Sequence, residues 1–220
     1  MSVAKSKFDR TINRSKRLIK QYKTFKGLDL PASKDMLRAS IVLSVAAIDA
    51  YVTDVFIELF IPFIQENDIN DNMCELLESK GFNLKSSLSL LKNDDPFSEL
   101  KQIIEGYLEK HTTQKADRID GLFDTYCLSN ITFNAAKKMS DNPKKLLNDF
   151  NEIVQRRHKI VHDGDYNKSQ SINDVSEKDI EKIDAIVTIV SGIEFILTNK
   201  FKEYFESFAE SEDNQNDEND

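Results

Sequence analysis

Residues 34–64 read KDMLRASIVLSVAAIDAYVTDVFIELFIPFI. Apolar side chains recur there at intervals of three and four residues, which is the spacing of one face of an α-helix. The stripe consists of Leu37, Ile41, Val45, Ile48, Val52, Val55, Leu59 and Phe63. A stripe this long predicts a helix buried along its length in the core, and it favours an all-α fold.

Three acids, Asp49, Asp54 and Glu58, interrupt this apolar stretch. Because an acid at the centre of a membrane-spanning helix costs roughly 2.5–3.5 kcal/mol, we expect a core helix in a cytoplasmic protein, with no membrane partner. Asp49 lies beside the stripe, four residues after Val45. A half-buried carboxylate needs a partner, so Asp49 is expected to pair with another part of the chain.

The rest of the chain also favours helices, because 6 Gly and 4 Pro in 220 residues permit few tight turns. The periodicity predicts further helices at residues 3–26, 73–80, 84–92, 96–110, 115–127, 143–162 and 176–208. Residues 130–140 and 163–176 are expected to be connectors. We therefore expect one domain over residues 1–208, with a basic N-terminal helix in 1–30 and an up-and-down bundle of four to five core helices, plus extra short ones, in 35–205.

Charge is unevenly distributed along the chain, whose net charge is −8. Residues 1–26 contain nine Lys or Arg against one acid, so this helix could contact phosphates or could simply be a solvated amphipathic helix. Residues 209–220 contain six acids and no base, which predicts a disordered tail. Cys74 and Cys127 form no Cys-x-x-Cys motif and are expected to be reduced, partly buried thiols.

The predicted helix 143–162 ends in Arg156-Arg157-His158-Lys159-Ile160-Val161-His162. On a helical wheel Arg157 falls in the middle of the apolar arc, where a guanidinium must be paired or must face a cleft. Asp49 is the candidate partner. His158 and His162 fall at the rim of that arc, and the helix C-terminus favours a cation at His162.

A fixed positive charge beside two imidazoles suits phosphoryl chemistry on RNA. A histidine can move a proton while the ribose 2′-OH attacks the adjacent phosphate, and an arginine can stabilise the charge that develops. This chemistry needs no metal or other cofactor, and the sequence shows no convincing cluster of metal-binding carboxylates. His111 has no such surroundings and is expected to be solvated.

The Arg157-to-His162 stretch resembles the R-x4-6-H motif of HEPN domains, with a polar residue, His158, after the arginine. The surrounding His162-Asp163-Gly164-Asp165 and Ala46-Ala47-Ile48-Asp49-Ala50-Tyr51-Val52 resemble the RiboL-PSP-HEPN branch, from about residue 35 to 205. The resemblance implies a bundle of four or five helices and a metal-independent endoribonuclease. It also implies a homodimer with a shared cleft, a bacterial toxin or antiviral role, and an antitoxin partner such as a nucleotidyltransferase.

These considerations predict Arg157 and His162 as catalytic residues. Asp49 would orient Arg157, while His158 and Arg156 would support the site. Two alternatives remain open: a non-catalytic HEPN module that binds RNA or a partner protein, and a purely structural subunit. In the structural alternative, Arg157 would pair with Asp49 and His162 would cap its helix.

Overall fold

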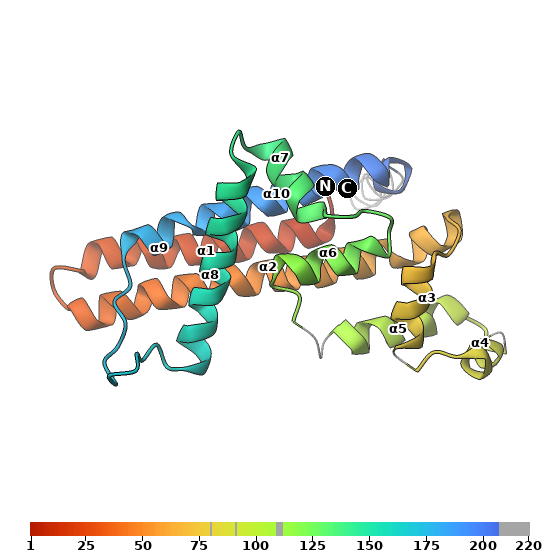
Figure 1. The fold of residues 1–220 in the computed structure, drawn as a ribbon, viewed down its shortest axis with the longest axis horizontal. Helices are drawn as coiled ribbons and strands as arrows, with labels where there is room; N and C mark the ends of the chain where they lie inside the picture. The colour runs from red at the N-terminus through yellow and green to blue at the C-terminus, as the bar shows by residue number, and fades with distance from the viewer. Residues whose placement is uncertain (80, 91, 109–111, 207–220) are drawn as a thin grey trace, which may run out of the picture.

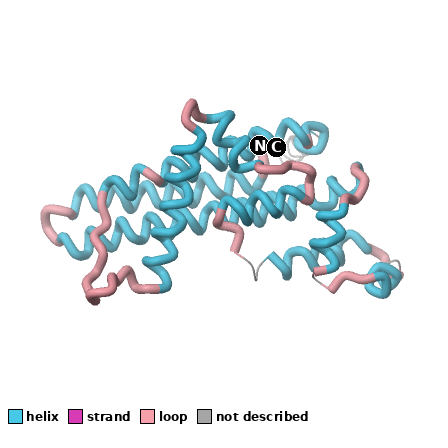
Figure 2. The backbone as a smooth tube through the Cα atoms, in the orientation of Figure 1, coloured by secondary structure: helices cyan, strands magenta, loops and turns pink. Residues whose placement is uncertain are grey.

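The computed structural model describes residues 1–79, 81–90, 92–108 and 112–206, which form an all-α fold (Figure 1). Its helices are α1 (Val3–Phe25), α2 (Leu30–Glu66), α3 (Asp71–Glu78), α4 (Leu84–Leu90), α5 (Pro96–Leu108), α6 (Ala116–Asp124), α7 (Ile131–Met139), α8 (Pro143–His162), α9 (Glu177–Glu181) and α10 (Ile183–Lys200). No strand occurs in this part of the chain, as the tube in Figure 2 shows. The predicted fold class is confirmed, whereas His111 and the acidic tail 209–220 lie outside the described residues.

Helices α1 and α2 form the long hairpin on which the rest of the molecule packs (Figure 1). The apolar stripe of α2 is buried from Leu37 to Phe63, and Phe8 and Ile12 of α1 pack against the same core. Helix α2 starts four residues earlier than expected, because Asp29 caps it by accepting a hydrogen bond from the Ala32 amide at 3.0 Å. Its length and hydropathy would also suit a membrane span, yet 56% of its most apolar window is buried within the molecule.

A buried carboxylate ties the start of α1 to α2 and α10. Glu194, which is 8% exposed, accepts hydrogen bonds from the Ser2 amide at 2.6 Å, from Ser2 Oγ at 2.8 Å and from Tyr51 Oη at 3.0 Å. Burial and the nearby carboxylate raise the pKa of Tyr51 well above its ordinary value. The phenol therefore stays a donor, and this network joins three helices at one end of the bundle.

Residues 130–140 are not the connector that the sequence suggested, because they form α7. Ile131, Ala135 and Ala136 of this helix are buried, and α7 packs against α10. The two helices approach so closely that a Cβ added at Gly192 would lie 2.8 Å from Ala135 Cβ. The apolar face of α7 is too short to show a clear helical period, so tertiary packing decides its conformation.

Two further predictions need correction. Cys74 and Cys127 are free thiols as expected, but both are exposed rather than partly buried. The predicted helix 176–208 is divided at Lys182 into α9 and α10, and a capping box between Ser176 and Asp179 starts α9. The split lets α9 pack against α2 before the chain continues into α10.

Helix α8 carries the Arg/His motif and crosses the α1–α2 hairpin (Figure 1). Asn142 caps its start by accepting from the Lys145 amide at 3.1 Å, and Phe150 and Ile153 anchor it in the core. It ends at His162, as predicted, followed by Gly164 with φ +60°, a left-handed conformation that glycine adopts without strain. The motif thus occupies the last turns of α8.

Candidate functional site

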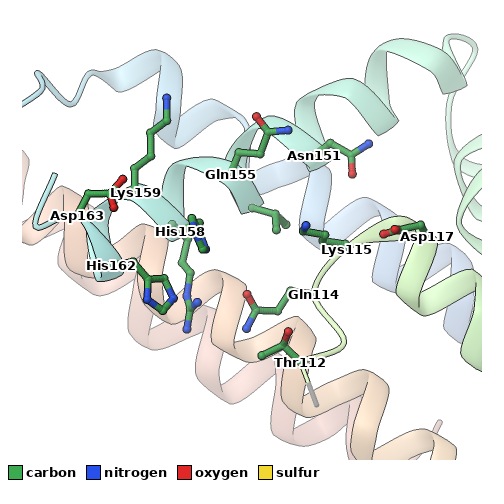
Figure 3. Close-up of a pocket in the computed structure, with 12 residues that line it drawn as sticks. Thr112, Gln114, Lys115, Asp117, Asn151, Gln155, His158, Lys159, His162 and Asp163 are labelled. Carbon is green, nitrogen blue, oxygen red and sulfur yellow. The ribbon is translucent and has the colours of Figure 1, made fainter. Parts of the chain in front are cut away.

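The last turns of α8 form one wall of a cleft of about 570 Å³ (Figure 3). The opposite wall is the segment 112–117, which leads into α6. The cleft is lined by Thr112, Gln114, Lys115, Asp117, Asn151, Val154, Gln155, Arg157, His158, Lys159, His162 and Asp163. Arg157, His158 and His162 are therefore brought together on one surface, as the sequence predicted.

His158 and His162 lie one helical turn apart, and their rings are in contact. The ring centroids are 4.4 Å apart, with an angle of 39° between the planes. Both side chains are exposed to solvent, and both line the cleft (Figure 3). Two imidazoles at this separation can act on neighbouring atoms of one bound molecule, one taking a proton and the other giving one.

Arg157 lines the same cleft and is partly buried. Its Nε is buried with no hydrogen-bond partner, and no described residue forms an ion pair with its guanidinium. The neighbouring Arg156, by contrast, forms an ion pair with Asp165. Since a guanidinium keeps its charge at any ordinary pH, the unpaired donors of Arg157 make this wall suited to binding an anion.

The predicted ion pair between Arg157 and Asp49 is not formed, because Asp49 is engaged by the opposite wall of the cleft. Its Oδ1 accepts from the Thr113 amide at 2.6 Å and from Thr113 Oγ1 at 2.8 Å, and its Oδ2 accepts from Gln114 Nε2 at 2.9 Å. The prediction that Asp49 needs a partner was sound. The partner is a loop that no sequence pattern connected to α2.

Gln114 is 7% exposed, and Asp49 fixes the direction of its side-chain amide. With the nitrogen bound to Asp49 on α2, the amide oxygen faces the cleft on the side of His158 (Figure 3). Lys115 follows directly and adds a positive charge to this wall. Sequence reasoning missed both residues, since they lie between two short helices where no periodicity marks a face.

Arg156, which was predicted to support the site, does not line the cleft. Its guanidinium forms a two-point ion pair with Asp165, of which the Nη2–Oδ2 contact measures 2.8 Å, and it donates to the Asp174 carbonyl at 3.1 Å. Arg38 Nε donates to the same carboxylate at 2.7 Å. Arg156 therefore has a structural role, joining α8 to the loop that follows it.

Asp165 is the centre of this network and is only 1% exposed. Burial alone would raise the pKa of its carboxyl, but hydrogen bonds from Arg156 and Arg38 outweigh that effect and hold the pKa below its usual value. Asn173 donates to the Asp165 carbonyl at 2.8 Å and closes the loop. No sequence pattern predicts this cluster, because Arg38, Arg156 and Asp165 come from separate segments.

Within the described residues, no group of three or more His, Cys, Asp or Glu side chains is placed to hold a metal ion. The charged groups that line the cleft are instead Lys115, Arg157 and Lys159 against Asp117 and Asp163, with the two imidazoles beside them. The unpaired guanidinium of Arg157 beside two imidazoles is chemically suited to a negatively charged ligand.

One of the three comparisons with known proteins finds a match. The family model described as RiboL-PSP-HEPN matches residues 9–194, which include α2, α8 and both walls of the cleft. Neither the search of curated proteins nor the search of solved structures finds a match.

Proposed function

Because the chain belongs to the RiboL-PSP-HEPN family, we propose that it is an endoribonuclease whose chemistry takes place in the cleft between α8 and residues 112–117. The family supports a nuclease or an RNA-binding module. The observation that favours cleavage is Arg157, whose charge is unpaired within the described structure beside two contacting imidazoles. A charge left without a protein partner is costly, and a bound phosphate would offset that cost.

In the proposed reaction the ribose 2′-oxygen attacks the adjacent phosphorus. One histidine removes the 2′-OH proton, the P–O5′ bond breaks, and the other histidine protonates the leaving 5′-oxygen. The products are a 2′,3′-cyclic phosphate and a 5′-hydroxyl end, and no oxidant or water is consumed in this step. His162 is assigned a catalytic role, and His158 is the adjacent group that completes the proton transfer.

Arg157 would stabilise the negative charge that accumulates on the non-bridging phosphate oxygens in the transition state. Lys115 lies across the cleft and would bind the phosphate of a neighbouring nucleotide. Asp49 would act indirectly as a positioning residue, because it holds Gln114 through the 2.9 Å hydrogen bond. The Gln114 oxygen then offers an acceptor to a ribose hydroxyl, a group that distinguishes RNA from DNA.

A second copy of this chain is proposed to complete the cleft. Val161, Tyr166 and Ile172 are 45%, 53% and 56% exposed, and they lie on or just after the last turn of α8. Exposed apolar side chains next to a polar site suit an interface between subunits. Light scattering of the intact chain would detect the dimer, and Val161→Asp should dissociate it; a monomer at every concentration would contradict the proposal.

The decisive experiment measures cleavage of a single-stranded RNA in EDTA by the wild type and by Arg157→Ala and His162→Ala. Both variants should retain the fold by circular dichroism and lose activity about 100-fold or more. Lys144→Ala is the control, because Lys144 is exposed at the far end of α8. If the wild type binds RNA without producing cleaved ends, the protein is a binding module instead.

A toxin or antiviral role would follow from this activity. Induced expression of the wild type in a bacterial host should then slow growth and fragment cellular RNA. Expression of Arg157→Ala to the same level should do neither. Equal growth of the two strains would contradict the toxin proposal and would leave the ribonuclease proposal to the cleavage assay.

A further inference from the structure

The outer face of α1 carries a stripe of exposed cations that the cleft does not use. It consists of Arg10, Arg14, Lys16, Arg17 and Lys20, which surround Asn13 in a shallow hollow. None of these residues lines the cleft at the end of α8. The stripe is therefore a separate feature of the surface.

The geometry of α1 places the three arginines of this stripe opposite its buried side. At about 100° per residue, Arg10, Arg14 and Arg17 fall within about 60° of one another, while Phe8 and Ile12 lie on the other side of the helix. Phe8 and Ile12 are 1% and 3% exposed, so they fix the orientation of the helix. The arginines thus project into solvent along a line about 10 Å long at 1.5 Å per residue.

The cations of the stripe are not neutralised by the protein. Within the part of the chain that the structure describes, the ion pairs of α1 and its C-cap involve Lys5, Lys7 and Lys26, and none involves the stripe. Asp9, the one acid of the helix, is held by Lys5 at 2.6 Å. Five unpaired cations line one hollow in a chain whose net charge is −8. Such a local field attracts a polyanion against the overall charge.

We propose that this stripe is a binding site for the phosphodiester backbone of RNA, separate from the cleft. Three of its five cations are arginines, whose planar guanidinium binds phosphate oxygens at two points. From Arg10 to Lys20 the stripe is about 15 Å long, which matches about four nucleotides at 3.4 Å each. This inference rests on the proposed ribonuclease function in one respect, which is that the polyanion bound by the stripe is RNA.

An anionic membrane is a less suitable ligand for this face. A helix that binds a membrane surface inserts large apolar side chains beside its cations. The exposed large apolar residues of α1 are Val3 and Phe25, near its two ends and outside the stripe. Between Arg10 and Lys20 the apolar side chains are buried or partly buried against the protein.

The test is binding of a fluorescent single-stranded RNA, 2′-O-methylated so that it cannot be cleaved, to the full chain over a range of salt concentrations. The triple variant Arg10→Gln, Arg14→Gln, Arg17→Gln should raise the Kd about tenfold. It should also reduce the slope of log Kd against log salt by about two, because three phosphate contacts are lost at about 0.7 each.

A matched control removes the same net charge elsewhere. Lys85, Lys92 and Lys137 are exposed, and none lines the cleft or the stripe. The triple variant with Gln at these positions should bind RNA like the wild type. An unchanged Kd for RNA in the arginine variant, or an equal loss of RNA affinity in the control variant, overturns the proposal. Binding of both variants to phosphatidylserine vesicles is measured alongside. If the arginine variant loses vesicle binding but keeps RNA binding, the proposal is also overturned.

This outcome is independent of cleavage. If the wild type proves inactive on every RNA but the arginine variant binds less tightly, the stripe is supported and the ribonuclease proposal fails. If cleavage is confirmed and the arginine variant binds RNA normally, the ribonuclease proposal is supported and the stripe proposal fails.

Discussion

Asp49 on α2 accepts a hydrogen bond from Gln114 Nε2 at 2.9 Å and thereby holds the wall of the cleft that faces the Arg/His motif. Two further hydrogen bonds, both from Thr113, bind the same carboxylate to the backbone and side chain of this wall. The long apolar helix is thus both the centre of the core and the support of the site. Asp49, the half-buried acid of this helix, links the core to the wall of the cleft.

Asp49→Ala is expected to reduce RNA cleavage about 10–100-fold, because misplacing a cleft wall by about 1 Å can cost that much. Asp54→Ala is the matched control. Asp54 lies on the same helix but pairs with the exposed Lys7 at 2.6 Å, away from the cleft. Steady-state cleavage and thermal melting of both variants check the prediction; equal activities would show that Asp49 matters only for folding.

Adjacent arginines on α8 should respond in opposite ways to the same substitution. Arg157→Met removes a charge that has no partner in the described structure, so the melting temperature should hold or rise while cleavage is lost. Arg156→Met leaves the 1% exposed Asp165 without one of its two arginines and should cost about 3 kcal/mol or more. Urea unfolding of the two variants, with cleavage assays alongside, tests this contrast directly.

How far the sequence predicted this site depends on how local each relationship is. The positions of Arg157, His158 and His162 follow from helical spacing within one helix, and the structure places all three at the cleft. The partners of Asp49 and Arg156 follow from where distant loops cross those helices, and residues 112–115 and 163–175 have no periodicity. Sequence reasoning therefore identified buried charges that need partners but named the wrong partner for Asp49.

The contrast between local spacing and distant contacts also explains which helices the sequence predicted. A long apolar stripe such as that of α2 can be predicted because many positions show the same helical spacing. Helix α7 has nine residues, and its start is positioned from outside by Asp120, which accepts from the Thr132 amide at 2.8 Å. Such a helix depends on tertiary contacts, which no local window contains.

The Asp165 network should make stability depend on pH below about 4. The pKa of Asp165 is below its usual value in the folded state, so as pH falls through about 4 the unfolded chain takes up the proton first. The stabilisation is therefore present above that pH and is lost below it. Asp165→Asn lacks this contribution, and the difference in free energy of unfolding from the wild type should narrow between pH 5 and pH 3. A constant difference would contradict the assignment.

Gly192 and Gly121 provide a matched test of the packing between α7 and α10. Alanine at Gly192 would place its Cβ 2.8 Å from both the Cβ and the carbonyl oxygen of Ala135, so Gly192→Ala should destabilise the protein by about 1–3 kcal/mol. Gly121 lies in α6 with nothing within 4 Å of an added Cβ. Gly121→Ala should therefore stabilise by up to about 1 kcal/mol, through helix propensity alone. Chemical denaturation measures both, and a gain in stability at Gly192 would show that α7 does not pack on α10 in this way.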